Sequence, residues 1–336
     1  MTSFAGRPGA VVLAAYRPDP DLFTVQLRSI RDQTLGSFRC LVGADGGRDE
    51  VRRLVVAAVG DDPRFEVVGW DDNVGLYLNV ERLLGSLPAD AAWVALADQD
   101  DRWYPDKLER LVPHLDEVAL VSGQARVVGW PSGTVLATST SRHAVVFEDL
   151  LLENQVTGAF TVFRRELLDI ALPFPRLHTV TQMHDHWLAL SAAASGGWLV
   201  EHTVVQDYVQ HGGNLVGEVA LHRRWTPRRA LARLRTLADT YEGGHSPAQS
   251  LRAAHTLAFG WRRLTVETLT TRVDEPDDAL LRAAWVLSLR SRRRDALLLL
   301  WRGLRSSSVS PWVMATMVPG LPTELRLRAG AAPQAR

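Results

Sequence analysis

The residues of this chain best suited to chemistry are carboxylates that follow a short apolar run. Residues 93–97 are apolar, and Asp98, Asp100 and Asp101 follow them directly. A run of this length predicts a buried strand, and acids at the carboxyl end of a strand in an open α/β sheet lie where such sheets bind ligands. Carboxylates this close repel one another unless a cation lies among them. Mg²⁺ or Mn²⁺, bound by carboxylates and substrate phosphates, fits this pattern. The alternative is an acidic loop that caps the helix expected to start near Pro105.

Length and composition indicate a globular protein. The chain has 336 residues, of which 46% are hydrophobic, enough to bury a full core. Its one cysteine, Cys40, lies in an apolar run and is expected to pack in the core. The first ten residues lack the apolar segment of a signal peptide, and no apolar stretch has the length of a membrane span. We therefore expect a cytoplasmic protein.

The net charge of zero hides an asymmetry between the two ends of the chain. Residues 1–215 hold 18 basic and 28 acidic side chains, whereas residues 216–336 hold 20 basic and 10 acidic ones. An acidic body with a basic tail suggests two different tasks. Nucleic acid is a poor partner for this chain, because the acidic body would repel phosphates.

Short apolar runs alternate with helical segments through the first 125 residues, which is typical of a doubly wound, mostly parallel, Rossmann-like sheet. The predicted strands cover residues 10–15, 38–44, 65–68, 93–97 and 118–122, and the predicted helices cover residues 21–33, 49–59, 76–84 and 105–115. Asp21 is expected to cap the first of these helices. Neither a G-x-G-x-x-G dinucleotide fingerprint nor a phosphate-binding P-loop is present, which argues against the two commonest nucleotide-binding classes.

The pattern changes in the second half. A hairpin is expected across residues 127–136, a short helix over 147–152, and an apolar helix over 188–194 that Asp185 would open. Residues 223–240, 246–272 and 278–304 predict amphipathic helices. We expect two domains, residues 1–217 and residues 218–336.

Several segments, in order, resemble the inverting family-2 glycosyltransferases with a GT-A fold, and most closely the bacterial rhamnosyltransferase-like branch. The segments are A-A-Y-R at 14–17, A-D-G-G at 44–47, N-x-G-x-x-x-N at 73–79, D-Q-D-D-x-W at 98–103, H-D-H-W at 184–187 and Q-H-G-x-N at 210–214. Two of them depart from the family pattern, since Ala14 replaces a threonine and Ala44 replaces an acid. The resemblance covers about residues 8–217 and implies a GT-A sheet there. The helical C-terminal extension is predicted from the amphipathic pattern alone.

The resemblance also implies roles for residues that would bind the donor. Ala15, Tyr16 and Asp45 would bind the nucleotide, with Asp45 accepting from a base N–H and Tyr16 packing beside the ring. The alternative for Asp45 is an Asx turn with Gly46. Asn73 and Gly75 would lie under the ribose and diphosphate, the alternative being an ordinary turn.

The remaining roles concern the reacting groups. The resemblance implies that Asp98 binds sugar hydroxyls, that Asp100 and His211 bind the metal, and that Gly158 lets backbone approach the donor sugar. Asp185 would be the general base that takes the acceptor proton, which inversion requires on the side opposite the leaving nucleotide. The alternatives are a helix N-cap for Asp185 and a structural role for His211.

The function implied is transfer of a hexosyl or rhamnosyl group from a UDP- or dTDP-sugar to a saccharide or lipid-linked acceptor, with inversion and Mg²⁺ or Mn²⁺, in synthesis of cell-surface polysaccharide or glycoconjugate. The alternatives are an inactive GT-A-like binding module and a sugar nucleotidyltransferase. The basic tail is expected either to contact an anionic membrane surface or to form a helical bundle with solvated arginines.

Overall fold

The predicted strands come together in one sheet of nine strands in this computed structural model, which describes residues 3–177, 183–211, 226–306 and 308–330. The strand order is β3-β2-β1-β4-β8-β6-β9-β5, with β7 paired to β6. The strands are β1 (Gly9–Ala15), β2 (Phe38–Asp45), β3 (Phe65–Trp70), β4 (Trp93–Ala97), β5 (Arg102–Trp103), β6 (Leu120–Gly129), β7 (Val135–Ala137), β8 (Thr161–Arg164) and β9 (Trp198–Gln210). The first four strands are parallel, and β8 pairs antiparallel with both β4 and β6. The mostly parallel α/β sheet predicted from the sequence is thus confirmed.

Helices cover both faces of the sheet. They are α1 (Pro20–Arg31), α2 (Arg48–Val59), α3 (Leu76–Gly85), α4 (Lys107–Leu111), α6 (Leu168–Ala171) and α7 (His184–Ser195). Alternate residues of β1 and β2 pack under α1 and α2, while the opposite face receives α3. Gly43 makes room for α3, because a Cβ atom there would lie 2.4 Å from the Leu83 side chain. The doubly wound arrangement therefore depends on small residues as well as apolar ones.

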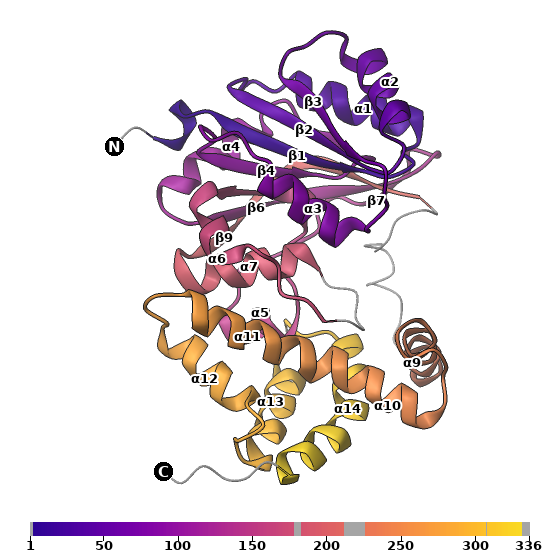
Figure 1. The fold of residues 1–336 in the computed structure, drawn as a ribbon, viewed down its shortest axis with the longest axis vertical. Coiled ribbons are helices and arrows are strands. Elements are labelled where there is room, and N and C mark those ends of the chain that lie inside the picture. The colour runs from indigo at the N-terminus through magenta and orange to yellow at the C-terminus, as the bar shows by residue number, and fades with distance from the viewer. Residues whose placement is uncertain (1–2, 178–182, 212–225, 307, 331–336) are drawn as a thin grey trace. The chain divides into compact units, whose positions relative to one another are not determined.

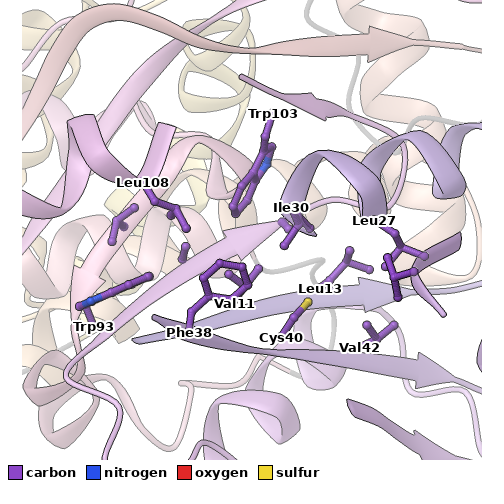
Figure 2. Packing of buried hydrophobic residues seen from close by; sticks show 14 of the residues in the cluster. Val11, Leu13, Leu27, Ile30, Phe38, Cys40, Val42, Trp93, Trp103 and Leu108 are labelled. Atoms are coloured by element: carbon purple, nitrogen blue, oxygen red, sulfur yellow. The ribbon is translucent and has the colours of Figure 1, made fainter. Parts of the chain in front are cut away.

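The core beneath α1 combines residues that lie far apart in the sequence. Figure 2 shows Val11 and Leu13 of β1, Cys40 of β2 and Ile30 of α1 in one cluster, with Trp103 beside them. Cys40 is fully buried, as predicted. Burying apolar surface of this extent supplies most of the driving force for folding.

Some boundaries differ from the sequence predictions. Asp19, not Asp21, caps α1, since its carboxylate accepts from the backbone N–H groups of Asp21 and Leu22. The helix predicted over 105–115 stops as an α-helix at Leu111 and continues as a 3-10 helix. β5 was not predicted, because two residues carry no periodicity; its Arg102 forms a salt bridge of 2.6 Å with Asp207 of β9.

A second, helical unit is built around α9 (Pro227–Glu242), α10 (Pro247–His255), α11 (Trp261–Arg272), α12 (Asp278–Leu287), α13 (Arg293–Arg305) and α14 (Pro311–Gly330). Figure 1 draws these helices in orange to yellow. The short helix α5 (Phe147–Leu152) groups with this unit although it lies within the first half of the chain. The domain boundary predicted at 217/218 lies outside the described residues. None of the described helices combines the length and hydropathy needed to cross a bilayer.

Candidate active site

The three acids after β4 do not share one environment. Asp101 is fully buried, and its carboxylate accepts from Gln206 Nε2 at 2.6 Å and from the backbone N–H of Val209 at 3.0 Å. Asp98 and Asp100 are only partly buried. Asp101 therefore connects the end of β4 to β9 and caps no helix, while Asp98 and Asp100 remain available for chemistry.

A buried lysine stands behind these acids. Lys107 is fully buried, and its Nζ donates to the carbonyl of Ala159 at 2.6 Å and to Gln206 Oε1 at 2.5 Å. It also lies over the Trp103 ring, 3.7 Å from the centroid. Burial holds the pKa of Lys107 well below its usual value, and the charges of Asp101 and Asp98 oppose that shift. The Lys107 amine thus lies on the core side of the acids and bonds the same Gln206 side chain that donates to Asp101.

The predicted metal ligands Asp100 and His211 lie together. His211 follows β9, and its Nε2 lies 2.6 Å from Asp100 Oδ2, although the two residues are 111 positions apart in sequence. Their proximity follows from Asp101, whose bond to Val209 holds the end of β9 against the end of β4. The rest of that motif, residues 212–214, lies outside the described residues.

Asp185 lies in the first turn of α7 and reaches toward the segment before β8. Its Oδ2 accepts from the backbone N–H of Gly158 at 3.4 Å, and its Oδ1 accepts from the backbone N–H of His186 at 2.7 Å. Met183, not Asp185, occupies the N-cap position. The N-cap alternative for Asp185 is therefore wrong.

Gly158 is needed where α7 approaches. A Cβ atom at this position would lie 2.7 Å from His184 Nε2 and 3.5 Å from the Asp185 Cβ atom. His184 is itself buried, which lowers its pKa. The lack of a side chain at Gly158 therefore lets α7 pack closely against this segment. The predicted contact between Gly158 and the donor sugar stays a prediction.

The acids of β4 and α7 share one electrostatic environment. Burial, together with the charges of Asp100 and Asp185, raises the pKa of Asp98 to about 7, against the opposing charge of Lys107. The charge of Asp185 therefore acts on Asp98, although the two residues belong to different elements. A divalent cation would relieve this repulsion, and Asp100 with His211 offers one carboxylate and one imidazole. No group of three or more metal-ligating side chains occurs within the described residues. Two protein ligands suit Mg²⁺ or Mn²⁺ where phosphates and water complete the coordination.

The residues predicted to bind the nucleotide lie after β1, β2 and β3. Asp45 is buried, and its two carboxylate oxygens accept from the backbone N–H groups of Val74 and Gly75, each at 2.8 Å. The Asp45 carboxylate therefore bonds the loop after β3 and does not form the alternative Asx turn with Gly46. Asn73 Nδ2 donates to the Asp45 carbonyl at 3.3 Å, and Gly75 adopts a φ of 84°, a value that favours glycine. Asp45 therefore shapes the loop at Asn73; its bond to a base stays a prediction.

Tyr16 is joined to the acidic segment by Gln99, a residue of the D-Q-D-D-x-W motif to which the sequence analysis assigned no role. Its backbone N–H donates to Gln99 Oε1 at 2.8 Å, and Gln99 Nε2 donates back to the Tyr16 carbonyl at 3.2 Å. Ala15, the last residue of β1, is buried, whereas the Tyr16 side chain is 46% exposed. The exposed ring can pack against a planar ligand.

Sequence reasoning missed Lys107 and Gln206, and it gave no role to His184 although this residue lies in the H-D-H-W motif. For Lys107 the one available signal was composition, because it is the only lysine among 38 basic residues. Lysine differs from arginine in carrying a compact amino group, with three rotatable donors, on a flexible stem. This group can reach the acceptors that surround Lys107 in the core.

Comparison with known proteins supports the resemblance. Residues 11–170 match the model of the family Glycosyl transferase family 2. This stretch carries the sequence pattern of that family. It runs from β1 to the helix that follows β8 and contains the acids after β4. Asp185 and His211 lie beyond the matched residues.

Solved structures of low sequence identity share the fold. The crystal structure of S. aureus TarS 1–349 in complex with UDP-GlcNAc is 15% identical, with a TM-score of 0.53 over 96% of this chain and 90% of that chain. The mannosyltransferase PcManGT from Pyrobaculum calidifontis, in complex with GDP-Man and Mn²⁺, is 19% identical, with a TM-score of 0.50 over 97% and 89% of the two chains. The fold is thus of the GT-A type with a helical C-terminal region.

A curated relative matches a shorter segment. The uncharacterized protein y4gI of Sinorhizobium fredii is 31% identical over 108 residues, which make up 32% of this chain and 12% of that protein. The match therefore spans only a small part of the relative's length.

Proposed function

We propose that this protein is an inverting glycosyltransferase that moves a sugar from a UDP- or dTDP-sugar to a hydroxyl of a saccharide or lipid-linked acceptor. The observation that carries the proposal is the convergence of Asp98, Asp100, Asp185 and His211, which come from the ends of β4, α7 and β9. The family pattern over residues 11–170 supports the same reaction class.

In this proposal Asp185 acts as the general base. Its two bonds to backbone N–H groups fix the carboxylate without neutralising it, so it can accept a proton from the acceptor hydroxyl as that oxygen attacks the anomeric carbon. The bond between the sugar and the diphosphate breaks on the opposite face. Proton transfer to Asp185 and departure of the nucleoside diphosphate thus balance the reaction.

Asp98, Asp100 and His211 would act on the donor side. Asp100 and His211 would hold Mg²⁺ or Mn²⁺, and a metal bound there supplies charge stabilisation for the leaving diphosphate. Asp98 would bind hydroxyls of the donor. Tyr16 and Asp45, with the loop at Asn73 and Gly75, would bind the nucleotide, and a pyrimidine suits a base pocket of this kind.

The setting we propose is synthesis of cell-surface polysaccharide or glycoconjugate on the cytoplasmic face of the membrane. Residues 218–336 would provide peripheral contact with that membrane. A hexosyl or rhamnosyl group is the transferred sugar that we propose, from the resemblance to the rhamnosyltransferase-like branch.

A thermal-shift screen tests donor binding. The purified chain should be stabilised by a UDP- or dTDP-sugar in the presence of Mn²⁺ and much less so with EDTA, since a ligand at about 100 times its Kd adds about 2.7 kcal/mol to folding stability. Asp100→Asn should lose the metal-dependent part, while Asp32→Asn, an exposed acid paired with Arg31, should not.

Transfer itself is then measured with the donor so identified. Release of nucleoside diphosphate and the anomeric configuration of the product, read by NMR, should show inversion. A folded chain that binds no nucleotide-sugar, or that binds one but releases no nucleoside diphosphate with any acceptor or with water, would support the inactive binding module instead.

A further inference from the structure

A pocket of about 500 Å³ lies within the helical unit and is lined by residues of α5, α12 and α13. Its volume is in the range of small-molecule sites. Most of its walls are apolar and include Leu151 of α5, Val286 and Leu287 of α12, and Leu298, Leu299 and Trp301 of α13. An apolar chain is the kind of group that such walls would accept.

Arginines stand at the same pocket. Arg282, Arg302 and Arg305 line it together with Glu148 and Asp149. Asp149 is already engaged by Arg302 Nε at 2.7 Å, and Glu148 lies 3.8 Å from Arg282 and 3.9 Å from Arg302. Arg305 stacks on the Trp301 ring at 4.4 Å, and no carboxylate of the described residues lies within 4.0 Å of it. The pocket therefore has an apolar interior and a guanidinium available for an anion.

Large apolar side chains are exposed on the two helices that contribute most of the pocket lining. Six large apolar side chains of α12 and α13 are exposed: Leu281, Trp285, Leu297, Leu298, Trp301 and Leu304. The two tryptophans are 53% and 54% exposed. Exposed apolar residues that gather on neighbouring helices indicate an interaction surface.

The positive charge of α12 and α13 favours an anionic partner. Residues 278–305 hold seven arginines and two aspartates. Tryptophan at the boundary between water and lipid, leucine on the buried side and arginine near phosphates make up the composition of helices that lie on anionic membranes.

We propose that this pocket and its rim bind an anionic phospholipid of a bilayer surface, with one acyl chain in the pocket and the headgroup phosphate at Arg305 and Arg282. The proposal rests on the proposed peripheral membrane contact for its setting, but lipid binding needs no sugar transfer. The two proposals can therefore fail separately.

Flotation of the full chain with vesicles tests the proposal. The protein should float with vesicles containing about one third phosphatidylglycerol and remain unbound with phosphatidylcholine alone, because the headgroup charge is required. Binding should weaken as salt rises. Equal binding to both vesicle types, or no binding to either by folded protein, overturns the proposal.

Paired variants localise the contact. Arg305→Gln should weaken binding about fivefold and Trp301→Ala about tenfold, in keeping with the usual contributions of one basic residue near an anionic surface and one buried aromatic side chain. Both positions are solvent-exposed, so circular dichroism should report an unchanged fold. Arg53→Gln on α2 and Trp130→Ala, which is 42% exposed, are the matched controls outside the helical unit. Loss of binding in the controls equal to that in the variants contradicts the assignment.

Two further measurements distinguish a lipid chain in the pocket from a second copy of the protein on this face. Phosphatidylglycerol with brominated chains should quench tryptophan emission, and Trp301→Phe should reduce that quenching if a chain enters the pocket; unchanged quenching contradicts the pocket. A second copy of the chain is the other candidate occupant. A dimer by light scattering that Trp301→Ala converts to monomer would show that a second copy, not lipid, covers this face.

Discussion

Gly158 offers the sharpest test of how the proposed base is positioned. In Gly158→Ala the new methyl group would lie 2.7 Å from His184 Nε2 and 3.5 Å from the Asp185 Cβ atom. Carbon atoms at such a separation from nitrogen overlap, and the His184 ring is buried, so it has little room to give way. The φ angle of Gly158 is not among the positive values, so the substitution costs only packing.

Overpacking of a buried site usually costs about 1–3 kcal/mol, so we expect Gly158→Ala to lose about 2 kcal/mol of unfolding free energy. Urea unfolding followed by circular dichroism measures this loss. If α7 shifts to relieve the contact, Asp185 shifts with it, and transfer should fall more than stability alone explains.

A double-mutant cycle isolates the cause. His184→Ala removes the ring, so the methyl group should cost at least about 1 kcal/mol less in that background. Gly85→Ala is the matched control, because Gly85 ends α3 and no atom lies within 4 Å of the position that a methyl group would occupy there; it should be neutral or slightly stabilising. A Gly158→Ala protein as stable as wild type, or costs that simply add in the cycle, would refute this account of the site.

Other predictions follow from the same contacts. Asp185→Asn keeps the acceptor for the His186 N–H but removes the charge, so transfer should fall by about 10²–10⁴-fold while the melting temperature changes little; transfer at the wild-type rate would exclude the general-base role. Asp100→Asn should abolish the Mn²⁺ dependence of donor binding measured by calorimetry, and retained dependence would contradict the metal assignment. In the helical unit, burial raises the pKa of Glu324, but bonds from His255, Arg263 and Arg328 outweigh burial and lower this pKa to about 2. A lowered pKa stabilises the fold above the unfolded value of 4.5, and this contribution is lost as pH falls toward and through about 2. In Glu324→Gln the free energy of unfolding should lose this pH-dependent contribution. A profile of stability against pH equal to that of the wild type would contradict the assignment.

The sequence was sufficient where a local pattern specifies a local structure. The apolar run at 93–97 predicted β4 at its observed bounds, and the alternation of apolar runs with helical segments predicted the parallel core of the sheet. Motif order alone suggested which acids to examine. These features could be predicted because strand and helix periodicities, like short motifs, are properties of neighbouring residues.

Other features depended on contacts between distant residues. No local pattern indicates that α5 groups with the helices after residue 226, or that a two-residue strand at Arg102 pairs with β9. The cap was also misjudged at Asp21, since the side chain that reaches the free N–H groups depends on where the backbone leaves the helical path.

The sequence by itself determined the fold class and the identity of the acidic residues after β4. Only the tertiary structure decided that Asp101 turns inward to β9, that Gln206 links it to Lys107, and that His211 thereby meets Asp100 from 111 positions away. The physical reason is that burial makes an unpaired charge costly, so the environment of each acid is set by whichever distant group can satisfy it.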